Sequence, residues 1–129
     1  MPDYKEIRYN YKKDIKKGTC FCILSGLQIN DQTELSLEHF VPLSRGPYYE
    51  CKQSYNIFPA FKIINGIKGS LLPCEYFENR EKLLQKTLSK GHLNRKNTAI
   101  LKAAIENIPN YKINPCNYCI LANCCRDSR

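Results

Sequence analysis

The order of strand-like, turn-like and helix-like segments between residues 35 and 69 constrains the fold more than any other feature of this sequence. Residues 35–41 begin with alternating apolar and polar side chains, which is typical of a short strand. A loop rich in Gly, Pro and Tyr covers residues 44–54, and residues 55–58 again have the composition of a strand. This order predicts two short strands joined by a long loop and followed at once by a helix.

The following helix is predicted over residues 60–68. Pro59 suits its first position, where a missing N–H is not needed, and Gly69 suits its C-terminal cap. Two more helices are expected, over residues 79–90 with an Asn79 cap and a stop at Gly91, and over residues 94–108 with Pro109 closing it. Residues 19–24 indicate a further short buried strand, whereas residues 2–18 fit an edge strand, a helix or a basic arm equally well.

These elements predict one α+β domain over residues 1–129. We divide it into a basic N-terminal arm (1–18), a core (19–75), a helical extension (79–108) and a Cys-rich tail (109–129). In the core, a small antiparallel hairpin would pack on the helix over residues 60–68. We find no apolar run long enough to cross a membrane and no secretory signal, so we expect a cytoplasmic protein with no membrane partner.

Positive charge is concentrated at the two ends of the sequence. The net charge is +8, with six Lys and Arg against three acids in residues 1–19 and eight against two in residues 79–112. Residues 20–78 carry four basic side chains against six acidic ones. Basic flanks around a mildly acidic centre fit a protein that binds a polyanion and holds a cation, although solvated Lys-rich helices would give the same composition.

The eight cysteines fall into two groups. Four are scattered through the first 74 residues, and Cys116, Cys119, Cys124 and Cys125 lie close together near the C-terminus. In a reducing compartment the second group could bind a structural zinc ion through its Cys-x-x-Cys pair and later thiolates, with Cys74 as another candidate ligand. Without a second correctly spaced pair, the composition favours the alternative that these four residues are small buried hydrophobic side chains.

Polar residues at the junctions of residues 35–69 match the needs of phosphodiester hydrolysis. A neutral imidazole can take a proton from water near neutral pH, which suits His39. A hard divalent cation stabilises charge on the leaving oxygen, and Glu38 and Asn65 offer the oxygen ligands that Mg²⁺ prefers. Lys68 could neutralise a phosphate, or it could be an ordinary solvated lysine at a helix end.

The segment over residues 37–73 resembles the HNH endonuclease motif, the ββα-metal unit of homing, phage and CRISPR nucleases. The resemblance rests on Glu38-His39 with Pro42 three residues later, Asn56 at the second strand, and Asn65 followed by Lys68-Gly69. The preceding Cys22-Ile23-Leu24-Ser25-Gly26 resembles a lead-in found in part of the family. Together these parts cover a little over a third of the chain in the family's order.

The resemblance implies a role for each of these residues. His39 corresponds to the general base, Glu38 and Asn65 to the ligands of one Mg²⁺ or Mn²⁺, and Asn56 to the residue that pins the loop and helps to position the base. Lys68 corresponds to a basic residue near the phosphate, and Arg45 is a second candidate for binding nucleic acid. The chain lacks the two Cys-x-x-Cys pairs with which many family members bind zinc, having Phe61 and Ile64 at the second pair. We therefore expect packing to hold this core together.

The sequence thus predicts a metal-dependent endonuclease, with DNA favoured over RNA as the substrate. One such site cuts one strand, so cutting both would require a homodimer or two binding events. Two alternatives stay open: a module on the same scaffold that binds nucleic acid without cutting it, and a zinc-stabilised interaction protein. His92, which lies between two basic segments, is expected to be an ordinary loop residue.

Overall fold

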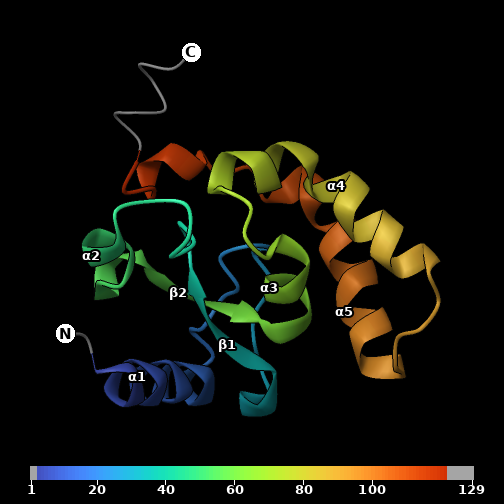
Figure 1. Cartoon of the computed structure of the whole chain (residues 1–129). Coiled ribbons are helices and arrows are strands. Elements are labelled where there is room, and N and C mark those ends of the chain that lie inside the picture. The colour runs from blue at the N-terminus through green and yellow to red at the C-terminus, as the bar shows by residue number, and fades with distance from the viewer. Residues whose placement is uncertain (1–2, 122–129) are drawn as a thin grey trace.

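An antiparallel pair of strands, β1 (Leu35–His39) and β2 (Ile57–Phe61), lies at the centre of the computed structural model, which describes residues 3–121 (Figure 1). The register pairs Leu35 with Phe61 at one end and His39 with Ile57 at the other. The predicted strands and their order are confirmed, and the α+β class with them. The second strand, however, begins two residues later than predicted and extends to Phe61.

Pro59 lies inside β2, opposite Leu37, and does not begin the helix as predicted. The backbone N–H of Phe40 donates to the Asn56 carbonyl at 2.9 Å. Because hydrogen-bonded and non-hydrogen-bonded pairs alternate in antiparallel strands, Pro59 falls at a position whose N–H would point away from β1. A proline therefore removes no bond of this two-stranded sheet, and α3 (Lys62–Lys68) begins only after Phe61.

Helices surround the hairpin. The N-terminal segment, whose structure the sequence left open, is α1 (Tyr4–Lys17), capped by the Asp3 side chain and ended by Gly18 in a left-handed conformation. The other helices are α2 (Tyr48–Cys51), α4 (Pro73–Ser89) and α5 (Arg95–Glu106), and four short 3₁₀ turns cover Gln32–Glu34, Ser54–Asn56, Ile108–Asn110 and Pro115–Asn117. In Figure 1, α3 lies against the strands, and α4 and α5 pack together beside it.

Two predicted elements differ from those observed. Residues 19–24 do not form a strand: a single bridge between Phe21 and Gln28 is followed by a turn in which the Gly26 N–H donates to the Cys22 carbonyl. Helix α4 begins six residues earlier than its predicted start at Asn79. Pro73 occupies its first turn, and the Glu75 carboxylate accepts from the Leu72 N–H at 2.8 Å, which supplies the cap.

One hydrophobic core connects these elements. It includes Leu35 of β1, Ile64 of α3, Tyr76 of α4 and Leu101 of α5, all fully buried. The Tyr76 hydroxyl donates to the Leu24 carbonyl at 2.9 Å, which fixes α4 to the segment before the hairpin. Within residues 3–121, no helix is long and apolar enough to cross a membrane.

Candidate active site

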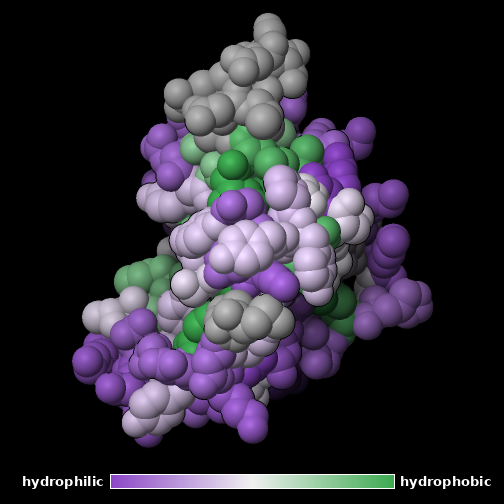
Figure 2. All heavy atoms as spheres, turned by 60° about the vertical axis from the view of Figure 1, so that its left-hand side comes forward, coloured by the Kyte–Doolittle hydropathy of each residue, from purple (hydrophilic) through white to green (hydrophobic). Residues whose placement is uncertain are grey.

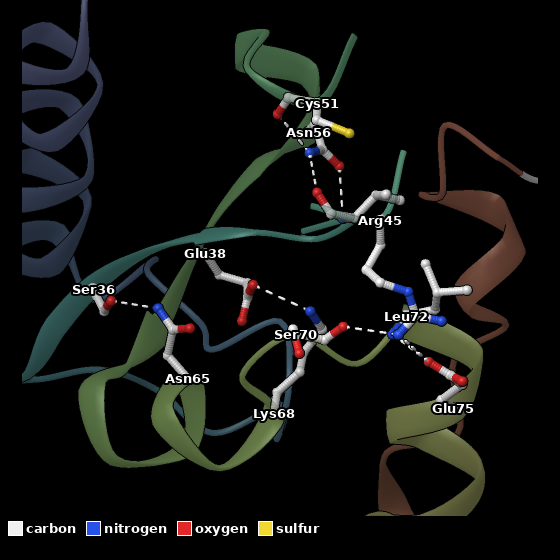
Figure 3. Close-up of polar contacts among 11 residues, drawn as sticks. Ser36, Glu38, Arg45, Cys51, Asn56, Asn65, Lys68, Ser70, Leu72 and Glu75 are labelled. Carbon is white, nitrogen blue, oxygen red and sulfur yellow. Dashed lines mark hydrogen bonds and ion pairs between the residues drawn. The ribbon is translucent and has the colours of Figure 1, made fainter. Parts of the chain in front are cut away.

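Strand β1 and helix α3 meet through two parallel side-chain contacts. The Ser36 hydroxyl accepts from the Asn65 amide nitrogen at 2.5 Å, and a Glu38 carboxylate oxygen lies 3.3 Å from the Lys68 ammonium nitrogen (Figure 3). Residues two apart share one face of a strand, and residues three apart share one face of a helix. The two periodicities therefore set a polar row on β1 against a polar row on α3.

The Glu38 carboxylate is buried with only part of its hydrogen-bonding capacity used. Its side chain is 3% exposed, and while Oε1 pairs with Lys68, Oε2 has no hydrogen-bond partner among the described residues. Burial raises the pKa of Glu38 to about 7, against the opposing effect of the Lys68 charge. The Lys68 side chain is fully buried, and that burial lowers its pKa, which the Glu38 carboxylate partly restores.

His39 follows Glu38 and is half-buried. Burial lowers the pKa of its imidazole, and the nearby Lys68 charge lowers it further, so the ring is neutral at pH 7. Its Nε2 atom is buried without a hydrogen-bond partner in the described part of the chain. The Tyr4 ring of α1 packs edge-on against the imidazole, with 6.0 Å between the ring centroids. The structure therefore presents a neutral histidine with an unused ring nitrogen.

Glu38, His39 and Asn65 line one cleft of about 380 Å³. The start of the following loop, including Leu43 and Ser44, forms another wall. Figure 3 shows the amide oxygen of Asn65 on the side of the Glu38 carboxylate, while its nitrogen faces Ser36. An unpaired carboxylate oxygen and an amide oxygen in one cleft are hard ligands, and they fit a cation such as Mg²⁺ or Mn²⁺.

Asn56 closes the loop that joins the two strands. Its amide oxygen accepts from the Val41 N–H at 2.9 Å, and its nitrogen donates to the carbonyls of Val41 at 2.9 Å and Cys51 at 2.7 Å. The side chain is completely buried, so all three bonds are shielded from water. Asn56 thus holds together the two ends of the loop that follows His39. It does not line the cleft.

Arg45 and Lys68, the two side chains predicted to bind nucleic acid, lie in different environments. Arg45 is partly exposed and donates to the Ser70 carbonyl at 3.0 Å while pairing with Glu75 at 3.1 Å (Figure 3). Lys68 instead points inward to Glu38, and its ammonium group does not reach the surface. Of these two basic groups, only Arg45 is therefore exposed, and Lys68 acts on the charge of Glu38.

The sequence analysis did not identify Ser36 and Tyr4 as parts of this site. Ser36 could have been found, because it precedes Glu38 by two residues and must share its face of the strand. Nothing in the sequence signals the contact between Tyr4 and His39, because it depends on how α1 packs along the hairpin. The Tyr11 hydroxyl fixes that packing by donating to the Ile57 carbonyl at 2.9 Å.

The cysteines of residues 3–121 do not form a metal site by themselves. Within that range no three His, Cys, Asp or Glu side chains lie close enough to hold a metal ion. Cys116 shares a surface pocket with Cys74, and Cys119 lies in the same C-terminal segment, while Cys124 and Cys125 lie outside the described residues. Phe61 and Ile64, which stand where the second zinc-binding pair of the HNH family would fall, are core residues.

The fold and the cleft define an α+β domain in which a strand and a helix bring together a carboxylate, an imidazole and an amide. Groups of this kind are suited to hydrolysis assisted by a divalent cation. No family model, curated protein or solved structure matches the chain.

Proposed function

We propose that this protein is a metal-dependent endonuclease of the HNH type that hydrolyses phosphodiester bonds, with DNA as the preferred substrate. The observation that carries the proposal is the cleft in which Glu38, His39 and Asn65 meet with two buried polar atoms unpaired. Buried polar groups are nearly always paired, so an unpaired carboxylate oxygen and an unpaired imidazole nitrogen on two residues of one cleft favour a ligand-binding or catalytic site.

In the proposed reaction His39 is the general base. Its neutral imidazole accepts a proton from a water molecule at Nε2, and that water attacks the phosphorus in line with the leaving 3′ oxygen. The leaving 3′ oxygen takes up a proton from solvent as its bond to phosphorus breaks, so the products carry a 5′ phosphate and a 3′ hydroxyl. Because burial and the Lys68 charge both lower the pKa of His39, the base stays unprotonated at neutral pH.

Glu38 and Asn65 would hold the cation through Oε2 and the amide oxygen. A bound Mg²⁺ or Mn²⁺ supplies Lewis-acid stabilisation of negative charge on the phosphate and the leaving oxygen. Lys68 compensates the buried charge of Glu38, and Ser36 holds the Asn65 amide in one orientation. The exposed Arg45, which follows the cleft residue Ser44, and the basic side chains of α1 would contact phosphates.

The test is cleavage of supercoiled plasmid by purified protein with Mg²⁺ or Mn²⁺. We expect nicked product from wild type and at least a hundredfold less from His39→Ala, which removes the base. His92→Ala is the matched control, because His92 is the other histidine of the chain and lies in an exposed loop between α4 and α5. Thermal melts of all three proteins exclude misfolding as the cause.

Two results would contradict this function. If His39→Ala cleaves as fast as wild type, His39 is not the base and the activity belongs to another site or to a contaminant. If wild type shifts nucleic acid in a gel but cleaves neither DNA nor RNA with either metal, the protein is a binding module on the same scaffold.

A further inference from the structure

The loop between the two strands carries an exposed group of tyrosines that the proposed chemistry does not use. Tyr48 and Tyr49 of α2 are 63% and 67% exposed, and Tyr55 just before β2 is 53% exposed. Figure 2 looks onto the side of the molecule that carries α1 and α2, where pale side chains of intermediate hydropathy lie next to the strongly polar ones. Three large exposed rings on one loop favour a ligand with flat apolar faces.

Positive charge accompanies these rings. The Lys52 ammonium group lies 4.8 Å from the centroid of the Tyr48 ring and 6.0 Å from that of Tyr49. The one carboxylate of this loop, Glu50, accepts a hydrogen bond from the Tyr55 hydroxyl. Stacking surface beside a lysine is the combination with which proteins bind bases and the adjoining phosphates of a nucleic acid strand.

The tyrosines are also held in place relative to the cleft. Asn56 joins both ends of the loop through its three buried hydrogen bonds, and Cys51 at the end of α2 is fully buried. Ser44, which lines the cleft, precedes Tyr48 by four residues, so their Cα atoms lie at most about 14 Å apart. A strand bound in the cleft can therefore reach α2 within a few nucleotides.

Resting on the proposed nuclease function, we infer that Tyr48 and Tyr49 form a platform on which unpaired bases of the substrate stack, so that the substrate is single-stranded or locally unpaired nucleic acid. The base faces of a duplex are covered by neighbouring base pairs and are not available to side chains on a protein surface. Unpaired bases expose these faces, and stacking on them is tolerant of sequence. The basic side chains of α1 would follow the strand's phosphates.

Binding without divalent metal tests the platform separately from cleavage. The probes are a fluorescein-labelled oligothymidine, an abasic strand of the same length and a duplex of the same length, measured by fluorescence anisotropy in EDTA. We expect wild type to bind oligothymidine most tightly. The Tyr48→Leu, Tyr49→Leu double variant should bind it on the order of tenfold more weakly or worse, with its affinity for the abasic strand unchanged.

The Tyr48→Phe, Tyr49→Phe double variant is the matched control, because it keeps both rings and loses only exposed hydroxyl groups. It should bind all three probes like wild type. The platform is overturned if the Leu variant binds oligothymidine as tightly as wild type, or if it loses the same factor on the abasic strand. Equal wild-type affinity for duplex and oligothymidine would overturn the preference for unpaired bases.

Cleavage assays with Mn²⁺ then separate the two proposals. If the Leu variant cuts single-stranded DNA more slowly than the Phe variant by the factor seen in binding, the platform belongs to the nuclease site. If both variants cut it equally fast, the platform is overturned while the nuclease stands. If the proteins bind as expected but none cleaves, the nuclease function is overturned while the stacking surface stands.

Discussion

Two buried polar side chains of the hairpin, Asn56 and Glu38, differ in how completely they are paired. Asn56 uses its amide in three hydrogen bonds to the loop backbone. Among the described residues, Glu38 keeps one oxygen paired with Lys68 and the other unpaired, and Nε2 of His39, the next residue along the chain, is also unpaired. A fully paired buried group stabilises the fold, whereas an unpaired one lowers stability and is retained where binding or catalysis uses it. Asn56 therefore has a structural role in this hairpin, whereas the incomplete pairing of Glu38 favours a functional one.

The largest effect on stability is expected for Asn56→Ala. This change leaves the Val41 N–H and two carbonyls buried without partners, so the free energy of unfolding should fall by about 4 kcal/mol. Chemical denaturation measures the loss. Asn79→Ala is the control, because it removes one exposed hydrogen bond to Glu75. A loss for Asn56→Ala no larger than the control's would remove the contrast between the two sites.

The next largest effect should come from Lys68→Met. It leaves the Glu38 carboxylate buried without its counter-charge, which costs about 3 kcal/mol near pH 8 and less near pH 5, where the carboxyl takes up a proton. The Glu38→Leu, Lys68→Met double variant removes both charges and should recover most of this loss. Urea denaturation of four proteins at both pH values, namely wild type, Lys68→Met, Glu38→Leu and the double variant, provides the double-mutant cycle. Additive losses would show that the two groups are not coupled.

Glu38 should also make stability depend on pH. Its pKa is about 7 in the folded protein and near its ordinary lower value when unfolded, so between these values the folded state holds more protons. The contribution of Glu38 to the free energy of unfolding is fully present below its unfolded pKa. It is lost as the pH rises through about 7. His39 contributes the opposite slope, because its folded pKa is lowered.

The Glu38→Leu, Lys68→Met variant lacks the Glu38 slope. It keeps His39, but loss of the Lys68 charge reduces the opposing His39 slope. The free energy of unfolding of the variant should rise relative to that of wild type from pH 5 to pH 7, as measured by denaturant titration at each pH. A constant difference across this range would mean that the folded pKa of Glu38 is not raised.

The sequence was sufficient for the parts of this fold that depend on local pattern. Alternation in residues 35–39 placed β1, and Gly69 marked the end of α3. The sequence-based prediction was wrong where tertiary contacts determine the ends of an element. Pro59 has the local features of a helix start, but its place in the hairpin register makes its missing N–H harmless in a strand. The start of α4 was missed because its cap comes from the Glu75 side chain inside the helix.

For the site, the sequence identified which residues lie together but not how they are paired. The resemblance to the HNH motif placed Glu38, His39 and Asn65 in one site, and all three line one cleft. The inward position of Lys68 was not predictable, because a lysine at a helix end is ordinarily solvated. Its burial follows from packing of α3 against β1, where a Glu38 carboxylate oxygen lies 3.3 Å from its ammonium nitrogen.

The smallest stability effect is expected for Ser36→Ala, which tests whether orientation of the Asn65 amide matters. The change removes one partly buried hydrogen bond, so stability should fall by about 1 kcal/mol. Mn²⁺ affinity, measured by calorimetry, should fall about tenfold, because the amide oxygen is no longer held toward Glu38. Ser89→Ala, on the exposed end of α4, is the control and should change neither quantity. Unchanged Mn²⁺ affinity in Ser36→Ala would mean that Asn65 is not a ligand, and the unpaired Glu38 oxygen would then need another explanation.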